Sequence, residues 1–181
     1  MLKTIALILL AALALLLIVA ATRPDSFRVE RSITVQASPE RLYALINDLK
    51  QFNRWNPYEK KDPAIKGSYG QTLAGPGARY AWESKEVGVG SLEIVESQPA
   101  MRVAMKLDFI SPFEAHNMAE FNIEPVAAQA GSGQASKVTW AMHGPANFIS
   151  KLMGLVFNMD RMVGSDFEAG LLNLKALAEQ P

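Results

Sequence analysis

The fold is decided by one stretch of the chain, Ile33-Thr34-Val35-Gln36-Ala37-Ser38-Pro39-Glu40-Arg41-Leu42-Tyr43-Ala44-Leu45-Ile46-Asn47-Asp48, in which the end of a strand leads directly into a helix. Ser38 offers an N-cap hydroxyl, Pro39 fits the first helical position, and Glu40 places an acid at the positive helix end. We therefore expect a helix that begins at Pro39. Its single apolar stripe is formed by Leu42, Leu45 and Ile46.

Upstream of this stretch, apolar and polar residues alternate from Phe27 to Val35, which is the period of a half-buried strand. Arg31 falls on the apolar parity. It would either orient an anionic group inside the domain or be turned outward by a bulge.

Downstream, the clearest strand pattern runs from Met101 to Phe109, where every odd position is large and apolar and three of the four even positions are charged. Between Val87 and Ile94 the apolar phase switches from odd to even, and glycines there predict a bulge that bends the strand. Further strands are expected over residues 78–84, 87–96, 117–124 and 137–143, with a short one near 68–72 and an exposed connection over 127–136.

Two helical segments complete the pattern. Residues 49–55 form a short helix that Asn56-Pro57 is expected to stop. Apolar residues at helical spacing from Asn147 to about Ala178 predict a long C-terminal helix with a break near Asn158. Gly154, Gly164 and Gly170 inside it would permit close packing on the sheet, permit a kink that opens the cavity, or simply be tolerated. The order is that of an α+β protein in which this helix covers a sheet of about seven antiparallel strands.

Composition narrows the possible functions. The chain has 181 residues, with 18 lysines and arginines against 18 aspartates and glutamates, so no global charge recruits nucleic acid. It has no cysteine, which excludes disulfides, thiolate catalysis and cysteine-ligated metals. His116 and His143 are the only histidines, and neither stands at metal-ligand spacing from a carboxylate, so we expect no metal site and no cofactor.

The N-terminus contains seventeen consecutive apolar residues, Ile5 to Ala21, between Lys3 and Arg23. This length fits an uncleaved transmembrane signal anchor, and the small residues at its end also fit a signal peptide cleaved after Ala21. We assign residues 1–22 to the anchor, 23–26 to a linker and 27–181 to one domain. We expect a single-pass protein with the amino end inside and the domain on the periplasmic or other extracytoplasmic side; because Lys3 and the terminal amine are opposed by Arg23, Arg28 and Arg31, the alternative is a domain that faces the cytoplasm.

The stretch from Ile33 to Asp48, together with Phe52-Asn53-Arg54-Trp55-Asn56-Pro57-Tyr58, residues 87–94 and residues 162–171, resembles the START-like (SRPBCC) superfamily, and within it the polyketide cyclase/dehydrase and lipid-transport group. The resemblance implies a helix-grip fold, in which a curved antiparallel sheet wraps a long C-terminal helix and leaves a cavity. Most members bind hydrophobic molecules and few are enzymes. No catalytic residue of the enzymatic members carries over.

Three functions follow from this reasoning: a membrane-tethered binder of a hydrophobic small molecule or lipid, a polyketide cyclase/dehydratase-like enzyme, and an interaction module whose cavity is filled by side chains. The binder is the preferred hypothesis. For each cavity residue the alternative is an ordinary core position. The candidates are Arg31, Trp55, Tyr80, Trp82, Met105, Phe109, Trp140, Met142 and Met159.

Overall fold

A computed structural model describes residues 2–127, 134–156 and 158–180. Its elements follow the order that the sequence predicts, with one additional helix. They are α1 (Leu2–Ala21), β1 (Ser26–Val35), α2 (Pro39–Asn47), α3 (Leu49–Trp55), α4 (Pro57–Lys61), β2 (Lys66–Tyr69), β3 (Arg79–Ser84), β4 (Gly88–Gln98), β5 (Arg102–Ser111), β6 (Ala115–Val126), β7 (Ala135–Pro145), α5 (Phe148–Val156) and α6 (Met159–Ala178).

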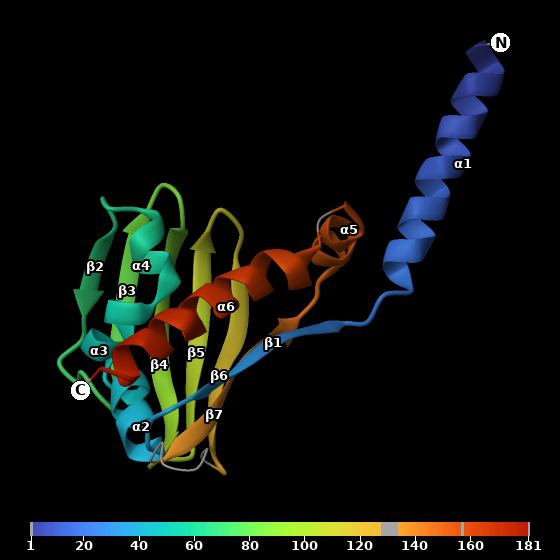
Figure 1. Ribbon diagram of the computed structural model, residues 1–181. Coiled ribbons are helices and arrows are strands. Elements are labelled where there is room, and N and C mark those ends of the chain that lie inside the picture. Colours follow the sequence, from blue (N-terminus) through green and yellow to red (C-terminus); the bar gives the residue numbers. More distant parts are fainter. Residues whose placement is uncertain (1, 128–133, 157, 181) are drawn as a thin grey trace.

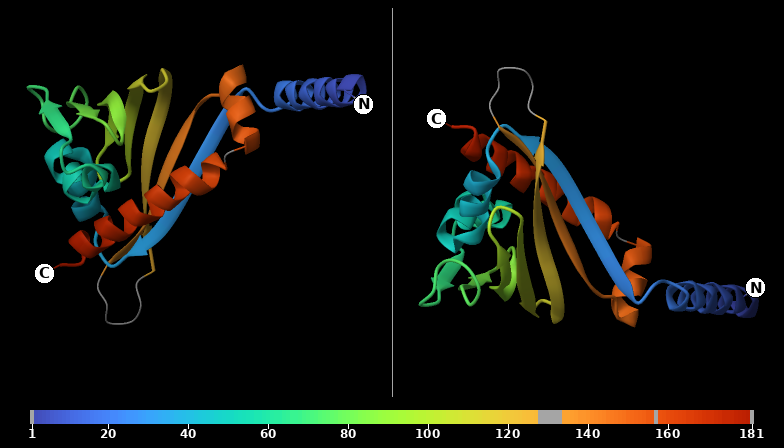
Figure 2. Two further views of the ribbon diagram at one scale, coloured as in Figure 1. Left: turned by 90° about the horizontal axis from the view of Figure 1, so that it is seen from above. Right: turned by 90° about the horizontal axis from the view of Figure 1, so that it is seen from below.

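The seven strands form one antiparallel sheet in the order β1-β7-β6-β5-β4-β3-β2. The sheet curves around α6, which crosses one face of it, while α2, α3 and α4 lie beside α6 (Figures 1 and 2). This arrangement is the helix-grip fold that the sequence predicts. The largest fully buried side chains lie between sheet and helices and include Trp55, Phe121, Phe167, Ile94, Met105 and Leu171.

The helix that follows β1 begins where the sequence predicts. The Ser38 hydroxyl accepts a hydrogen bond from the backbone N–H of Arg41 at 3.3 Å, and Pro39 is the first residue of α2. The prediction that Asn56-Pro57 ends the helical segment is only half right. Asn56 ends α3, but its side chain then caps α4 by accepting the Tyr58 N–H at 3.2 Å, so proline starts a new helix here.

The predicted bulge in β4 is confirmed, because the pairing of β4 with β5 shifts register at Val89/Gly90 and again at Ile94/Glu96. Such shifts bend a strand and increase its twist. A side chain at Gly90 would lie 2.6 Å from the Trp82 ring. Glycine therefore lets the indole lie directly against the neighbouring strand.

The C-terminal helix is broken as expected. The Asn158 side chain caps α6 by accepting the Arg161 N–H at 2.9 Å. A Cβ at Gly170 would lie 2.6 Å from the Trp140 ring, and one at Gly164 would lie 2.1 Å from the Arg31 guanidinium, so both glycines permit the close packing that the sequence suggests. Gly154 has no such neighbour within 4 Å.

Two predicted segments remain. The connection between β6 and β7 was expected over 127–136, and residues 128–133 of it lie outside the described part of the structure. Helix α1 projects away from the domain (Figure 1), and Ala20 alone among its described side chains is buried. Among the described residues, this one helix, over Lys3–Ala21, is long and apolar enough to cross a membrane.

Candidate functional site

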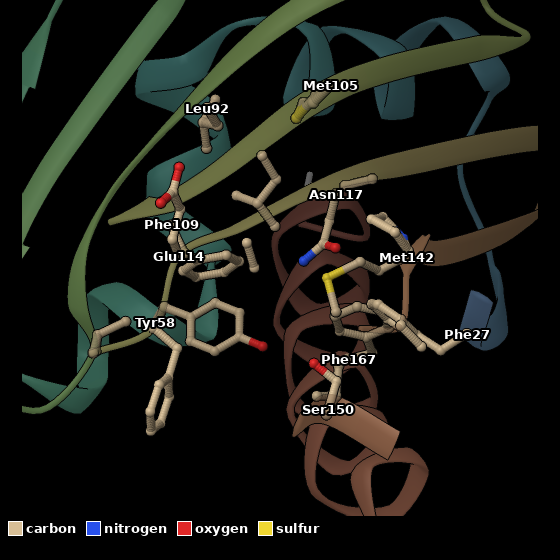
Figure 3. A pocket seen from close by; sticks show the side chains of 18 of the residues that line it. Phe27, Tyr58, Leu92, Met105, Phe109, Glu114, Asn117, Met142, Ser150 and Phe167 are labelled. Atoms are coloured by element: carbon tan, nitrogen blue, oxygen red, sulfur yellow. The ribbon is translucent and has the colours of Figure 1, made fainter. Parts of the chain in front are cut away.

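A cavity of about 830 Å³ lies between the concave face of the sheet and the helices. Its floor comes from β3 to β7, α6 contributes Val163 and Phe167, and α5 with the segment after α1 borders it at one end. Figure 3 shows the side chains that converge on this space. Most of them are apolar, which is the usual character of a small-molecule site.

Strand alternation and register explain why these side chains meet. Alternate residues of a strand share one face, and paired strands align them into rows across the sheet. Met105 of β5 pairs with Ala119 of β6, which pairs with Met142 of β7. The next row toward the β5–β6 turn contains Tyr80, Leu92, Leu107 and Asn117, and the one after it contains Trp82, Gly90, Phe109 and Ala115.

Six of the nine predicted cavity residues line this space: Tyr80, Trp82, Met105, Phe109, Trp140 and Met142. Trp55 is fully buried in the core instead, where its indole N–H donates to the Leu45 carbonyl at 2.9 Å and its ring meets Phe121 and Trp140 edge to face. Met159 is the first residue of α6, and its side chain lies outside the described part of the structure.

Arg31 does not line the cavity. Its strand pairs with β7 without a register shift, so the expected bulge is absent and the side chain keeps its inward parity. There it meets α6, donating to the Glu168 carboxylate at 2.7 Å and to Asp160 at 3.0 Å. These hydrogen bonds raise the pKa of Arg31 above its ordinary value. The guanidinium thus binds the edge strand to the helix, and protein carboxylates take the place predicted for an anionic ligand.

The sequence analysis missed the polar groups that α4 brings to the cavity wall. The Tyr80 hydroxyl donates to the Glu59 carboxylate at 2.5 Å. Burial, followed by this hydrogen bond, raises the pKa of Tyr80. Burial and the nearby Asp166 carboxylate raise the pKa of Tyr58. Both phenols are therefore neutral hydrogen-bonding groups at physiological pH.

Asn117 is a second polar feature that periodicity alone did not single out. It occupies an inward position of β6 between Ala115 and Ala119, and only 7% of it is exposed. In Figure 3 its amide and the Tyr58 hydroxyl both point into the cavity. A polar residue on an otherwise apolar strand face is the signal that would have identified it.

Two buried indole N–H groups, those of Trp82 and Trp140, have no hydrogen-bond acceptor among the described residues. Trp140 is held by stacking on Phe167, with ring centroids 4.1 Å apart. Within the same described residues, no group of three His, Cys, Asp or Glu side chains is arranged to hold a metal ion.

A curved sheet closed by a helix over an apolar cavity of ligand size defines a helix-grip ligand-binding domain. The family model for polyketide cyclase/dehydrase and lipid transport matches residues 26–179. The chain therefore belongs to that family, within the SRPBCC superfamily, as the sequence predicts. A search of the curated proteins finds no match.

Solved structures with the same fold include protein CV1439 from Chromobacterium violaceum (TM-score 0.59, 15% identity, 88% of this chain and 100% of that one). Hypothetical protein jhp0584 from Helicobacter pylori is similar too (TM-score 0.62, 13% identity, 87% and 90%). So is DynU16, a putative protein in the dynemicin biosynthetic locus (TM-score 0.57, 12% identity, 87% of this chain and 48% of that one). At these identities the likeness is one of fold.

Proposed function

We propose that this protein binds a hydrophobic small molecule or lipid in its cavity while α1 tethers it to a membrane. The observation that carries the proposal is the 830 Å³ cavity with its apolar floor. Sites for drug-sized ligands occupy about 300–1,000 Å³. An interaction module whose own side chains fill the interior would leave much less space, so the cavity volume favours the binder.

The side chains of the cavity wall indicate which kind of ligand would bind. Methionine and aromatic side chains supply an adaptable apolar surface, represented by Met105 and Met142 on the floor. Tyr58 and Asn117 offer neutral hydrogen-bonding groups beside it. We infer a mainly apolar ligand that carries at least one uncharged polar group, such as a hydroxyl or carbonyl.

The tether rests on α1. The nineteen helical residues from Lys3 to Ala21 span about 28 Å, close to the hydrocarbon thickness of a bilayer. A signal peptide has a similar composition, but its apolar region is usually about 7–15 residues long, and seventeen consecutive apolar residues run from Ile5 to Ala21. We propose an uncleaved anchor with the domain on the extracytoplasmic side. Protection of the domain from protease in sealed vesicles tests on which side of the membrane the domain lies.

The experiment is native mass spectrometry of the full chain released from detergent, combined with organic extraction. We expect a hydrophobic species bound in stoichiometric amount. Ala119→Phe should eject it, because Ala119 lies between Met105 and Met142 on the cavity floor. Ala81→Phe is the matched control, since Ala81 is exposed on the opposite face of β3. An empty wild-type protein with no affinity for hydrophobic probes would contradict the proposal.

One observation favours a second candidate, a cyclase- or dehydratase-like enzyme. The Tyr80 hydroxyl and the Glu59 carboxylate form a short hydrogen bond at the cavity wall, an arrangement that can move a proton to or from a bound substrate. Under this alternative, Glu59→Gln would abolish turnover of a polyketide-like substrate while leaving its binding intact. Equal product formation by the wild type and by Glu59→Gln would refute the enzymatic alternative.

A further inference from the structure

The mouth of the cavity has an exposed apolar rim. Phe113, in the β5–β6 turn, is 69% exposed, Ile149 of α5 is 65% exposed, and both line the cavity together with the exposed Met153. Ile110 at the end of β5 and Phe148 at the start of α5 are also exposed apolar side chains. We call Phe113, Ile149 and Met153 the mouth rim. A cluster of large apolar side chains around an opening marks a binding surface.

The mouth rim lies at the end of the domain from which α1 emerges. Helix α5 contacts the base of α1, and the two lie side by side in both views of Figure 2. The Asp25 carboxylate pairs with Lys151 of α5, and the Asp25 carbonyl accepts the Ala146 N–H at 2.7 Å. The segment after α1 is thus bound to the helix that carries two of the three rim residues.

The length of that segment restricts where the rim can be. Only Thr22, Arg23, Pro24 and Asp25 separate α1 from β1, and four residues cannot span more than about 15 Å even when fully extended. If α1 crosses a bilayer, the end of the domain that contains α5 and the cavity mouth must therefore lie at the surface of that same bilayer.

We propose that the mouth rim docks into the bilayer that holds α1, so that the ligand passes between lipid and cavity without crossing water. This inference rests on the tether in the proposed function. Exposed phenylalanine, isoleucine and methionine side chains are suited to the boundary between headgroups and acyl chains. Docking covers apolar surface that would otherwise face solvent.

Charge near the mouth indicates insertion rather than electrostatic attraction. Arg23 is the basic residue of the linker, Lys151 is already paired with Asp25, and Glu86 and Glu114 are acids that line the same opening. The mouth therefore has no excess of positive charge for anionic headgroups. Docking should persist at high ionic strength.

The absence of cysteine from the chain makes the test direct, because each variant carries a single thiol. We would label Ile149→Cys and Phe113→Cys with an environment-sensitive fluorophore in the full chain, reconstituted in phosphatidylcholine vesicles. Quenchers attached to lipid acyl chains, or dissolved in water, then report the location of each label. Met101→Cys is the matched control, since Met101 is 62% exposed but lies in the β4–β5 turn at the opposite end of the sheet. Leu10→Cys reports on α1 itself.

We expect the two rim labels to lose most of their emission to the lipid-borne quencher and to shift to the blue, with no change in high salt. The Met101→Cys label should respond to the aqueous quencher alone. Rim labels that behave like the Met101→Cys label, while the Leu10→Cys label is quenched by lipid, would overturn docking and leave the tether intact. Protection from both quenchers would indicate a second protein copy on the rim and also overturn docking. A Leu10→Cys label that lipid does not quench would overturn tether and docking together.

Discussion

Gly170→Ala should destabilise this protein, although the same change stabilises most helices. Gly170 lies in α6, where alanine is favoured over glycine by about 1 kcal/mol. The added methyl would lie 2.6 Å from the Trp140 ring and 2.9 Å from Pro57. Trp140 cannot move aside, because it stacks on Phe167 and meets Trp55 edge to face.

Overpacking of this kind costs about 1–3 kcal/mol. The rigid surroundings of Trp140 place Gly170→Ala at the upper end, so the net loss of unfolding free energy after the gain in helix propensity is about 1–2 kcal/mol. Gly154→Ala is the matched control, because Gly154 lies in α5 and a Cβ there meets no atom within 4 Å. That variant should gain about 1 kcal/mol.

Thermal unfolding of the full chain in detergent, followed by near-ultraviolet circular dichroism, measures both variants. About 1–2 kcal/mol corresponds to a melting temperature lowered by roughly 2–8 °C for a protein of this size. The near-ultraviolet signal should also change, since Trp140 is displaced. A Gly170→Ala variant that is as stable as Gly154→Ala would refute the view that α6 is packed against the sheet at this point.

Three further predictions concern the cavity and its border. Asn117→Leu should lower the affinity for the extracted ligand about tenfold in calorimetry, because one buried hydrogen bond contributes about 1 kcal/mol or more; unchanged affinity would exclude Asn117 from recognition. The hydrogen bond from His116 to Asp108 at 2.6 Å raises the pKa of His116, so its contribution to stability is complete below the unfolded-state pKa of about 6.5 and disappears as pH rises through the raised folded value. Urea midpoints from pH 6 to 9 should show this decline in the wild type but not in His116→Gln. Burial raises the pKa of Tyr58 and Tyr80, so ultraviolet titration should show two of the four tyrosines ionising only at higher pH or on unfolding.

The strands could be predicted because each depends on local periodicity, and the fold followed from their order and from the resemblance to the START-like superfamily. The alternation from Met101 to Phe109 fixes which side chains of β5 face inward, and the phase change after Val87 fixes the bulge in β4. Once strand order is known, the inward residues of neighbouring strands must form rows. Six predicted cavity residues are therefore found at the cavity wall.

The errors concern residues whose surroundings come from distant parts of the chain. Periodicity places Trp55 on an apolar helix face, but whether that face meets the cavity or the core depends on Phe121 and Trp140. Arg31 is bound by acids that lie 129 and 137 residues away in the sequence. Glu59 was not predicted as a site residue because Pro57 was interpreted as the end of a helix, although proline also favours the first turn of a helix.

The same helix accounts for both the closed and the open end of the cavity. Toward its C-terminus α6 is close to the sheet, with Leu171 and Leu174 buried and Gly170 against Trp140. The first residue of α6 is Met159, and the preceding helix α5 runs in a different direction instead of extending α6 along the sheet (Figure 1). Apolar side chains on the sheet are left uncovered by α6 here, and the cavity extends to α5, whose Ile149 and Met153 line it. Because α5 is attached to the base of α1, the fold itself directs the open end of the cavity to the side on which the proposed anchor lies.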